Sequence, residues 1–129
     1  MLGLVAGWAR RRSDVKGLAL VGSYARGAAR PDSDVDLVLL TDDPAPYLND
    51  DEWLTALTPA TMMRTKRWGA VVERRFRLES GIEVEINIAR PSWANTDSAD
   101  AGTLRVIRDG IRILYDPLGL LEKLIAASR

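Results

Sequence analysis

The residues of this chain best suited to chemistry lie in one stretch, from Gly22 to Asp36, which reads GSYARGAARPDSDVD. Asp34 and Asp36 are two residues apart at the start of an apolar run, so in a strand both carboxylates leave the same face. Gly22 lets a ligand approach the backbone closely, and Ser23 is a natural N-cap for a one-turn helix whose free N–H groups would face an anion. Hard oxygen ligands beside an anion site suit Mg²⁺ that carries a nucleoside triphosphate.

The alternative for the two aspartates is a solvated turn followed by the start of a strand. Asp36, however, enters a strand that is otherwise apolar on its face, where an unpaired carboxylate is expensive. A bound metal ion would remove that cost, so we favour the metal site.

The elements that must position these side chains are a helix over 2–12, a strand over 16–21 and a second strand over 35–41. The second strand is apolar on both faces beyond Asp36, which predicts a central strand covered on both sides. Residues 42–49 contain two prolines and predict a loop.

A hairpin is expected where residues 70–78 and 82–89 flank Ser80-Gly81. Its second arm alternates strictly, with apolar residues on one face and Glu83, Glu85 and Asn87 on the other. One face should pack on a core, and the other should meet either water or a site.

The remaining segments predict short elements. In chain order we expect a helix from Asp50 or Asp51 through Leu57, a helical turn at Met62 and Met63, a polar loop over 95–100, a helix over 103–109, a strand over 111–115 and a last helix from Pro117.

Composition excludes several kinds of chemistry. The 129 residues contain no cysteine and no histidine, which removes disulfides, Cys/His zinc sites and any Ser-His-Asp triad. The length fits one domain over 1–129. The formal net charge is zero, so nothing draws the whole chain to nucleic acid or to an anionic membrane, and nucleic acid is not an expected partner. Acidic residues gather in 32–52 and basic ones in 64–77; they could hold a metal–triphosphate between them or simply face water.

The chain is expected to be cytoplasmic. No apolar run reaches membrane-spanning length, and the N-terminal MLGLVAGWARRR has its apolar part before its basic part, the reverse of a signal peptide.

The stretch from Gly22 to Asp36 resembles the signature of the DNA polymerase beta-like nucleotidyltransferase superfamily, in which Gly-Ser and a short spacer precede Asp-x-Asp. The matching residues are Gly22, Ser23, Asp34 and Asp36. Later segments also look like small bacterial nucleotidyltransferase-domain proteins. The resemblance implies an α/β (α+β) fold, with a mixed sheet of four or five strands, helices on one face and the carboxylate cleft on the other.

The resemblance also implies a third carboxylate on a later strand. Glu83 and Glu85 both qualify by direction. We favour Glu85, which lies mid-strand between apolar residues, whereas Glu83 is nearer the turn; both could still merely face water. Many relatives carry Asp at this position, and aminoglycoside nucleotidyltransferases are similar to this chain in using Glu.

The implied reaction is nucleotidyl transfer. A hydroxyl attacks the α-phosphate of a nucleoside triphosphate, ATP being favoured, and pyrophosphate leaves. Asp34 and Asp36 would hold two Mg²⁺ ions, Glu85 would bind the second ion or act as general base, and Gly22 and Ser23 would hold the β and γ phosphates.

The acceptor and the partner stay open. Aminoglycoside nucleotidyltransferases carry a further helical domain for which 129 residues leave no room, so a homodimer, a partner subunit or a very small acceptor pocket must replace it. Minimal nucleotidyltransferases that act as antitoxins, pair with HEPN-type toxins and attach AMP to a toxin tyrosine match the motif equally well. A third possibility is a non-catalytic nucleotide-binding module, which would gain weight if Glu85 pointed away from Asp34 and Asp36.

Overall fold

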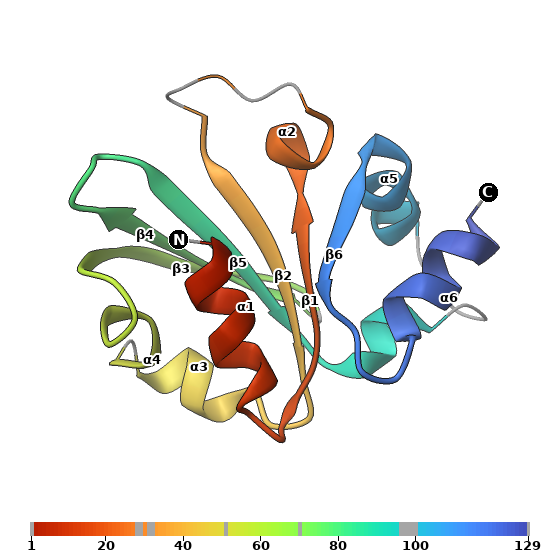
Figure 1. The fold of residues 1–129 in the computed structure, drawn as a ribbon, viewed down its shortest axis with the longest axis horizontal. Coiled ribbons are helices and arrows are strands. Elements are labelled where there is room, and N and C mark those ends of the chain that lie inside the picture. The colour runs from red at the N-terminus through yellow and green to blue at the C-terminus, as the bar shows by residue number, and fades with distance from the viewer. Residues whose placement is uncertain are drawn as a thin grey trace.

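One mixed β-sheet organises the chain (Figure 1). The computed structural model describes residues 2–27, 30, 33–50, 52–69, 71–95 and 101–128. These described residues form six strands in the order β3-β4-β5-β2-β1-β6. The strands are β1 (Val15–Val21), β2 (Val35–Thr41), β3 (Ala60–Trp68), β4 (Val71–Leu78), β5 (Glu83–Ala89) and β6 (Ile111–Tyr115). Neighbouring strands are antiparallel, except that β2 and β5 run parallel at the centre.

Short helices connect and cover the strands. They are α1 (Leu2–Arg10), α2 (Gly22–Ala25), α3 (Ala45–Asn49), α4 (Glu52–Thr55), the 3₁₀ helix η1 (Pro91–Ala94), α5 (Ala101–Asp109) and α6 (Leu120–Ala127). Within the described ranges, no helix has both the length and the apolar character needed to cross a bilayer.

The sheet is covered on both faces. Along β2, Leu37 and Leu39 pack in one apolar core with residues of α1, α3 and α4, whereas Val38 and Leu40 pack in a second core with residues of η1, α5 and α6. This alternation follows from the two-residue period of a strand. We call these the first face and the second face of the sheet.

The expected fold class is confirmed, with two differences. The described part of the sheet has six strands rather than four or five, and helices pack on both faces rather than on one. The sixth strand is β3, where the sequence predicted a helical turn at Met62 and Met63. Pairing along all of β4 decides the conformation of this segment, because ladder hydrogen bonds outweigh a weak local preference.

Two further segments differ from expectation. Residues 42–49 were expected to be a loop, but α3 begins after Pro44, and proline is tolerated in the first turn of a helix. The last helix begins at Leu120 rather than at Pro117. The expected polar loop over 95–100 lies, apart from Asn95, outside the described residues.

A partly buried carboxylate, that of Asp14, fastens α3 to the sheet. The Tyr47 hydroxyl donates a hydrogen bond of 2.5 Å to Asp14 Oδ2, and the Thr41 hydroxyl donates one of 2.9 Å to the same oxygen. Burial alone would raise the pKa of Asp14, but these hydrogen bonds outweigh it and hold the pKa below its usual value. The contact ties the start of β1, the end of β2 and α3 together under the first face.

Removing the Tyr47 hydroxyl should therefore destabilise the fold. We expect Tyr47→Phe to lower the free energy of unfolding by about 1–2 kcal/mol near neutral pH, because Asp14 loses a buried donor. A depressed carboxyl pKa gives stability that is present above the unfolded value and lost as pH falls, so the difference between variant and wild type should shrink on acidification. Urea unfolding at several pH values measures this. Tyr115→Phe is the control, since the Tyr115 hydroxyl has no hydrogen-bond partner within the described part of the chain; an equal loss in both variants would contradict the argument.

Candidate active site

The turn from β1 into α2 brings the backbone against a carboxylate. Gly22 has φ of +73°, which side-chain-bearing residues rarely adopt, and a Cβ at this position would collide with Asp36 Oδ2. The sequence predicted Ser23 as the helix N-cap, but the N-cap is Val21 and Ser23 lies inside α2, which makes no side-chain cap hydrogen bond. The first N–H groups of a helix have no intrahelical acceptor, so those of Gly22 and Ser23 remain suited to an anion.

Asp36 and Glu85 form the centre of the site. They are direct partners in the parallel pairing of β2 with β5, so both side chains leave the second face at the same level of the sheet. The two carboxyl groups are close enough to share a hydrogen bond. The structure therefore brings together two of the three expected carboxylates.

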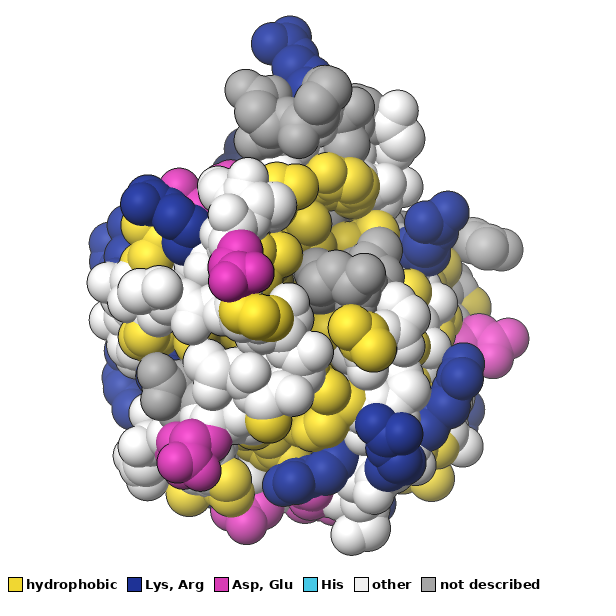
Figure 2. Space-filling view, turned by 60° about the vertical axis from the view of Figure 1, so that its left-hand side comes forward, with side chains coloured by type: hydrophobic (Ala, Val, Ile, Leu, Met, Phe, Trp, Pro, Cys, Tyr) yellow, Lys and Arg dark blue, Asp and Glu magenta, His cyan; other side chains and the backbone are white. Residues whose placement is uncertain are grey.

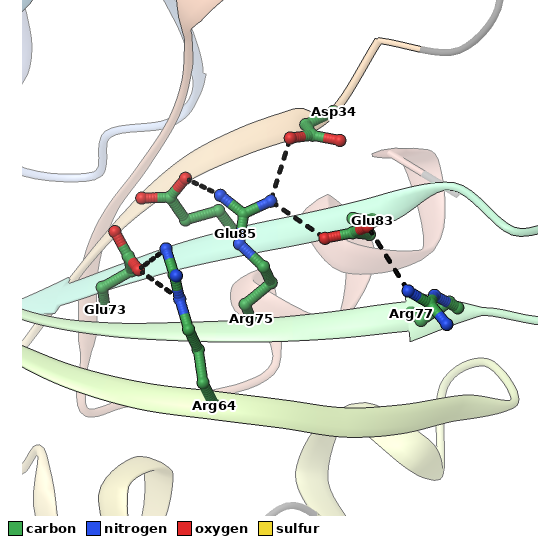
Figure 3. A network of polar contacts seen from close by, with 7 residues as sticks. All are labelled: Asp34, Arg64, Glu73, Arg75, Arg77, Glu83 and Glu85. Atoms are coloured by element: carbon green, nitrogen blue, oxygen red, sulfur yellow. Dashed lines mark hydrogen bonds and ion pairs between the residues drawn. The ribbon is translucent and has the colours of Figure 1, made fainter.

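A third carboxylate in this row is Glu73, from β4, which the sequence analysis did not single out. Glu73 is 5% exposed, and its carboxyl hydrogen-bonds with that of Glu85. Arg64 of β3 donates to Glu73 Oε2 from Nε at 3.2 Å and from Nη2 at 3.0 Å, as Figure 3 shows. One sequence signal could have identified Glu73: it is the single acidic residue of the basic segment 64–77. It lies two positions from Arg75, which places both side chains on the same face of the strand.

Crowded carboxylates shift one another's proton affinity. Burial is the main cause that raises the pKa of Glu85 to about 8, and the hydrogen bond with Glu73 and the charge of Asp36 add to it. Burial also raises the pKa of Asp36, against the opposing effect of its hydrogen bond with Glu85. Asp36 and Glu85, partly buried side by side, therefore disfavour the charged form of each other.

Arg75 supplies positive charge on the outer side of this row (Figure 3). Its guanidinium donates to Asp34 Oδ2 at 2.9 Å, to Glu83 Oε1 at 3.1 Å and to Glu85 Oε2 at 2.9 Å. These bonds raise the already high pKa of Arg75, the bond to Asp34 most strongly. Arg75 thus joins β4, β5 and the start of β2 through their side chains.

A pocket of about 670 Å³ opens beside the carboxylates, on the second face. Its lining residues come from five strands, β1 to β5, and three helices, α2, η1 and α5, or their ends: Val21, Gly22, Arg26, Asp36, Val38, Trp68, Gly69, Val71, Glu73, Glu85, Asn87, Ala89, Trp93, Thr103, Val106 and Asp109. The acidic row lies at one end and apolar side chains at the other.

The predicted site residues divide between this pocket and its rim. Gly22, Asp36 and Glu85 line the pocket, whereas Asp34 and Ser23 do not. Asp34 is turned toward Arg75, with 45% of its side chain exposed. Glu83 also binds Arg75 and lies outside the pocket, which favours Glu85 over Glu83 as the third carboxylate.

The carboxylate oxygens of the site are of the kind that Mg²⁺ binds, but their positions do not form a complete metal site. Asp36 and Glu85 are hard oxygen ligands, and burial, together with the charge of nearby carboxylates, raises the pKa of each. Across the described residues, however, no three acidic side chains are arranged as a ready metal cluster. Asp34 would have to leave Arg75 to complete one.

The comparisons agree with the motif. The sequence matches the nucleotidyltransferase domain family over residues 5–92, and the chain belongs to this family. Its fold is similar to that of a solved structure described as "Crystal structure of the toxin-antitoxin with AMP-PNP", with a TM-score of 0.53 and 14% identity over 98% of this chain and 82% of that chain. At this identity the likeness concerns the fold. No curated protein matches the chain.

The raised pKa of Glu85 predicts how stability depends on pH without metal. The folded protein keeps this proton up to about pH 8, whereas the unfolded chain loses it near the ordinary value of 4.5. Folding therefore binds a proton between these values, and stability should fall as pH rises through this range. Thermal unfolding in EDTA measures it. Glu85→Gln should flatten the decline, and Glu83→Gln should leave it unchanged; a decline that survives Glu85→Gln would contradict the assignment.

Arg75 should stabilise the metal-free protein. We expect Arg75→Gln to lower the free energy of unfolding by about 2 kcal/mol, because it leaves partly buried carboxylates without their cationic donor. Arg77→Gln is the matched control: its guanidinium is 54% exposed and reaches Glu83 only at 3.6 Å, so little change is expected. Urea unfolding in EDTA compares the two. Equal effects would mean that the contacts of Arg75 with Asp34 and Glu85 contribute nothing measurable.

Proposed function

We propose that this chain transfers a nucleoside monophosphate from a nucleoside triphosphate, with ATP as the favoured donor, to a hydroxyl acceptor. The observation that carries the proposal is the pairing of Asp36 with Glu85 beside Gly22, at one end of a pocket of about 670 Å³. Membership of the nucleotidyltransferase domain family supports the reaction class. Residues 1–129 act as one domain in this proposal, in the cytoplasm, where nucleoside triphosphates are available.

Each residue has a stated role. The backbone at Gly22 and Ser23 binds the β and γ phosphates, and Arg26, which lines the same pocket, adds positive charge near them. Asp34, Asp36 and Glu85 are the metal ligands. Glu85 either binds the second ion or accepts the proton of the attacking hydroxyl as general base.

Two Mg²⁺ ions are proposed at these carboxylates. When bound, Mg²⁺ would neutralise the triphosphate and lower the pKa of the attacking hydroxyl. Asp34 exchanges its bond with Arg75 for this position. Arg75 then keeps Glu83 and Glu85, so the third carboxylate stays in place while the site rearranges.

The acceptor is a small molecule or a protein. The protein acceptor is supported by the solved structure of similar fold, which is that of a toxin–antitoxin with AMP-PNP. In this second candidate function, the chain is an antitoxin that attaches AMP to a HEPN-like toxin. A homodimer is the other way to complete the acceptor side. The non-catalytic reading loses weight, since Glu85 lies beside Asp36 rather than pointing away.

Nucleotide binding tests the proposed site. Calorimetric titration with MgATP should show saturable binding that is lost in EDTA and weakened at least about tenfold by Asp36→Asn, since the amide removes a charged ligand. Asp42→Asn is the control, because Asp42 is exposed and lies away from the pocket. Binding that survives Asp36→Asn unchanged would sink the proposed site.

The label position then tests the reaction class. ATP labelled at the α-phosphate should pass its label to an acceptor, whereas ATP labelled at the γ-phosphate should not. Suitable acceptors are small hydroxyl compounds and the product of a neighbouring gene. Transfer from the γ position would mean phosphoryl rather than nucleotidyl transfer.

A further inference from the structure

We propose that the apolar end of the pocket holds the base of the nucleotide, stacked on Trp68. This inference rests on the proposed function, since it concerns the same pocket. It adds a second part to the site: an aromatic platform that binds the flat ring of the substrate, separate from the carboxylates that handle its phosphates.

Trp68 is exposed and yet held in place. It is the last residue of β3, at the edge of the sheet, and 55% of it is exposed. It pairs with Val71, so its side chain leaves the same face as that of Glu73. The Lys66 ammonium lies 4.1 Å from the centre of its ring. Trp68 also lines the pocket, so it presents an aromatic surface where the pocket meets the edge of the sheet.

The indole lies on the same side of the sheet as the acidic row. Trp68 and Glu73 leave the same face of the adjacent strands β3 and β4, and both line the pocket. Lys66, whose ammonium lies against the indole, does not itself line the pocket.

The other tryptophans clarify the difference. Trp8 and Trp53 pack against each other, with ring centroids 5.3 Å apart, in the core of the first face. Their role is packing. Trp68 and Trp93 instead line the pocket on the second face.

The sheet sets the direction in which a nucleotide would lie. Gly22 follows β1, Asp36 and Glu85 lie on β2 and β5, and Trp68 lies at the end of β3, two strands farther on. Phosphates at Gly22 with the reacting phosphorus at the carboxylates therefore leave the base on the β3 side. The pocket continues along β5 from Glu85 to Ala89, about 13 Å at the rise of a strand.

The apolar end also offers one oriented polar group. Asn87 donates from Nδ2 to the Leu37 carbonyl at 3.2 Å, which fixes the amide. Its oxygen remains as an acceptor, suited to the edge of a base. Val38 and Val71 give the floor the apolar character that favours a flat ring over a charged group.

The test separates the base from the phosphates. Calorimetry with Mg²⁺ should compare ATP with inorganic tripolyphosphate, which has the phosphates and no base. We expect Trp68→Ala to weaken ATP binding about tenfold, since base–aromatic stacking is of this order, and to leave tripolyphosphate binding unchanged. Trp68→Phe, which keeps an aromatic ring, should retain most of the affinity for ATP. Met63→Ala, at an exposed position of the same strand outside the pocket, should change neither.

Three other outcomes would overturn the inference. Equal weakening of both ligands by Trp68→Ala would mean that Trp68 acts through the carboxylates. Unchanged ATP binding would leave the apolar end for another occupant, such as an aromatic side chain of the acceptor. If the wild-type protein bound neither ATP nor tripolyphosphate, both the proposed function and this inference would be rejected. If tripolyphosphate binding depended on Asp36 but ATP binding did not depend on Trp68, the proposed function would stand and only this inference would be rejected.

Discussion

The structure of the site depends on one interaction, the parallel pairing of β2 with β5. Its register sets Asp36 directly beside Glu85. A shift of one residue in β2 would turn Asp36 into the apolar core of the first face, because side chains alternate along a strand. The same register places Val35, Leu37 and Val84 in that core, so hydrophobic burial enforces the position of the acidic pair. The fold thus maintains an arrangement of like charges that would be unfavourable by itself.

The surrounding arginines make this arrangement tolerable. Arg75 and Arg64 approach the acidic row from β4 and β3, each through more than one hydrogen bond (Figure 3). The basic segment of the sequence is therefore largely paired across the sheet. Figure 2 agrees with this: among the described side chains on the face in view, both signs of charge are dispersed around apolar patches, with no continuous basic field.

The pocket exists because the second face is covered unevenly. η1, α5 and α6 pack over the part near β1, β2 and the end of β5, but β3 and β4 carry no helix on this side among the elements that form the second core. The uncovered area begins at the carboxylates and ends at two tryptophans. The extent of η1, α5 and α6 over the second face would then decide both where the reaction takes place and where the base of the nucleotide binds.

The sequence by itself determined the mixed α/β class, the central strand 35–41, the hairpin and the motif from Gly22 to Asp36, because each has a local signal: a period of two, a turn dipeptide or a characteristic spacing. Only the tertiary structure decided the strand order, the sixth strand β3, the place of Glu73 and the contact of Asp34 with Arg75. These depend on which strands meet, and partners 24 to 50 residues apart, such as Arg74 and Asp50 or Asn87 and Leu37, leave no periodic trace in the sequence. Spacing can indicate which face a carboxylate leaves, but its neighbours there are fixed by long-range pairing and burial.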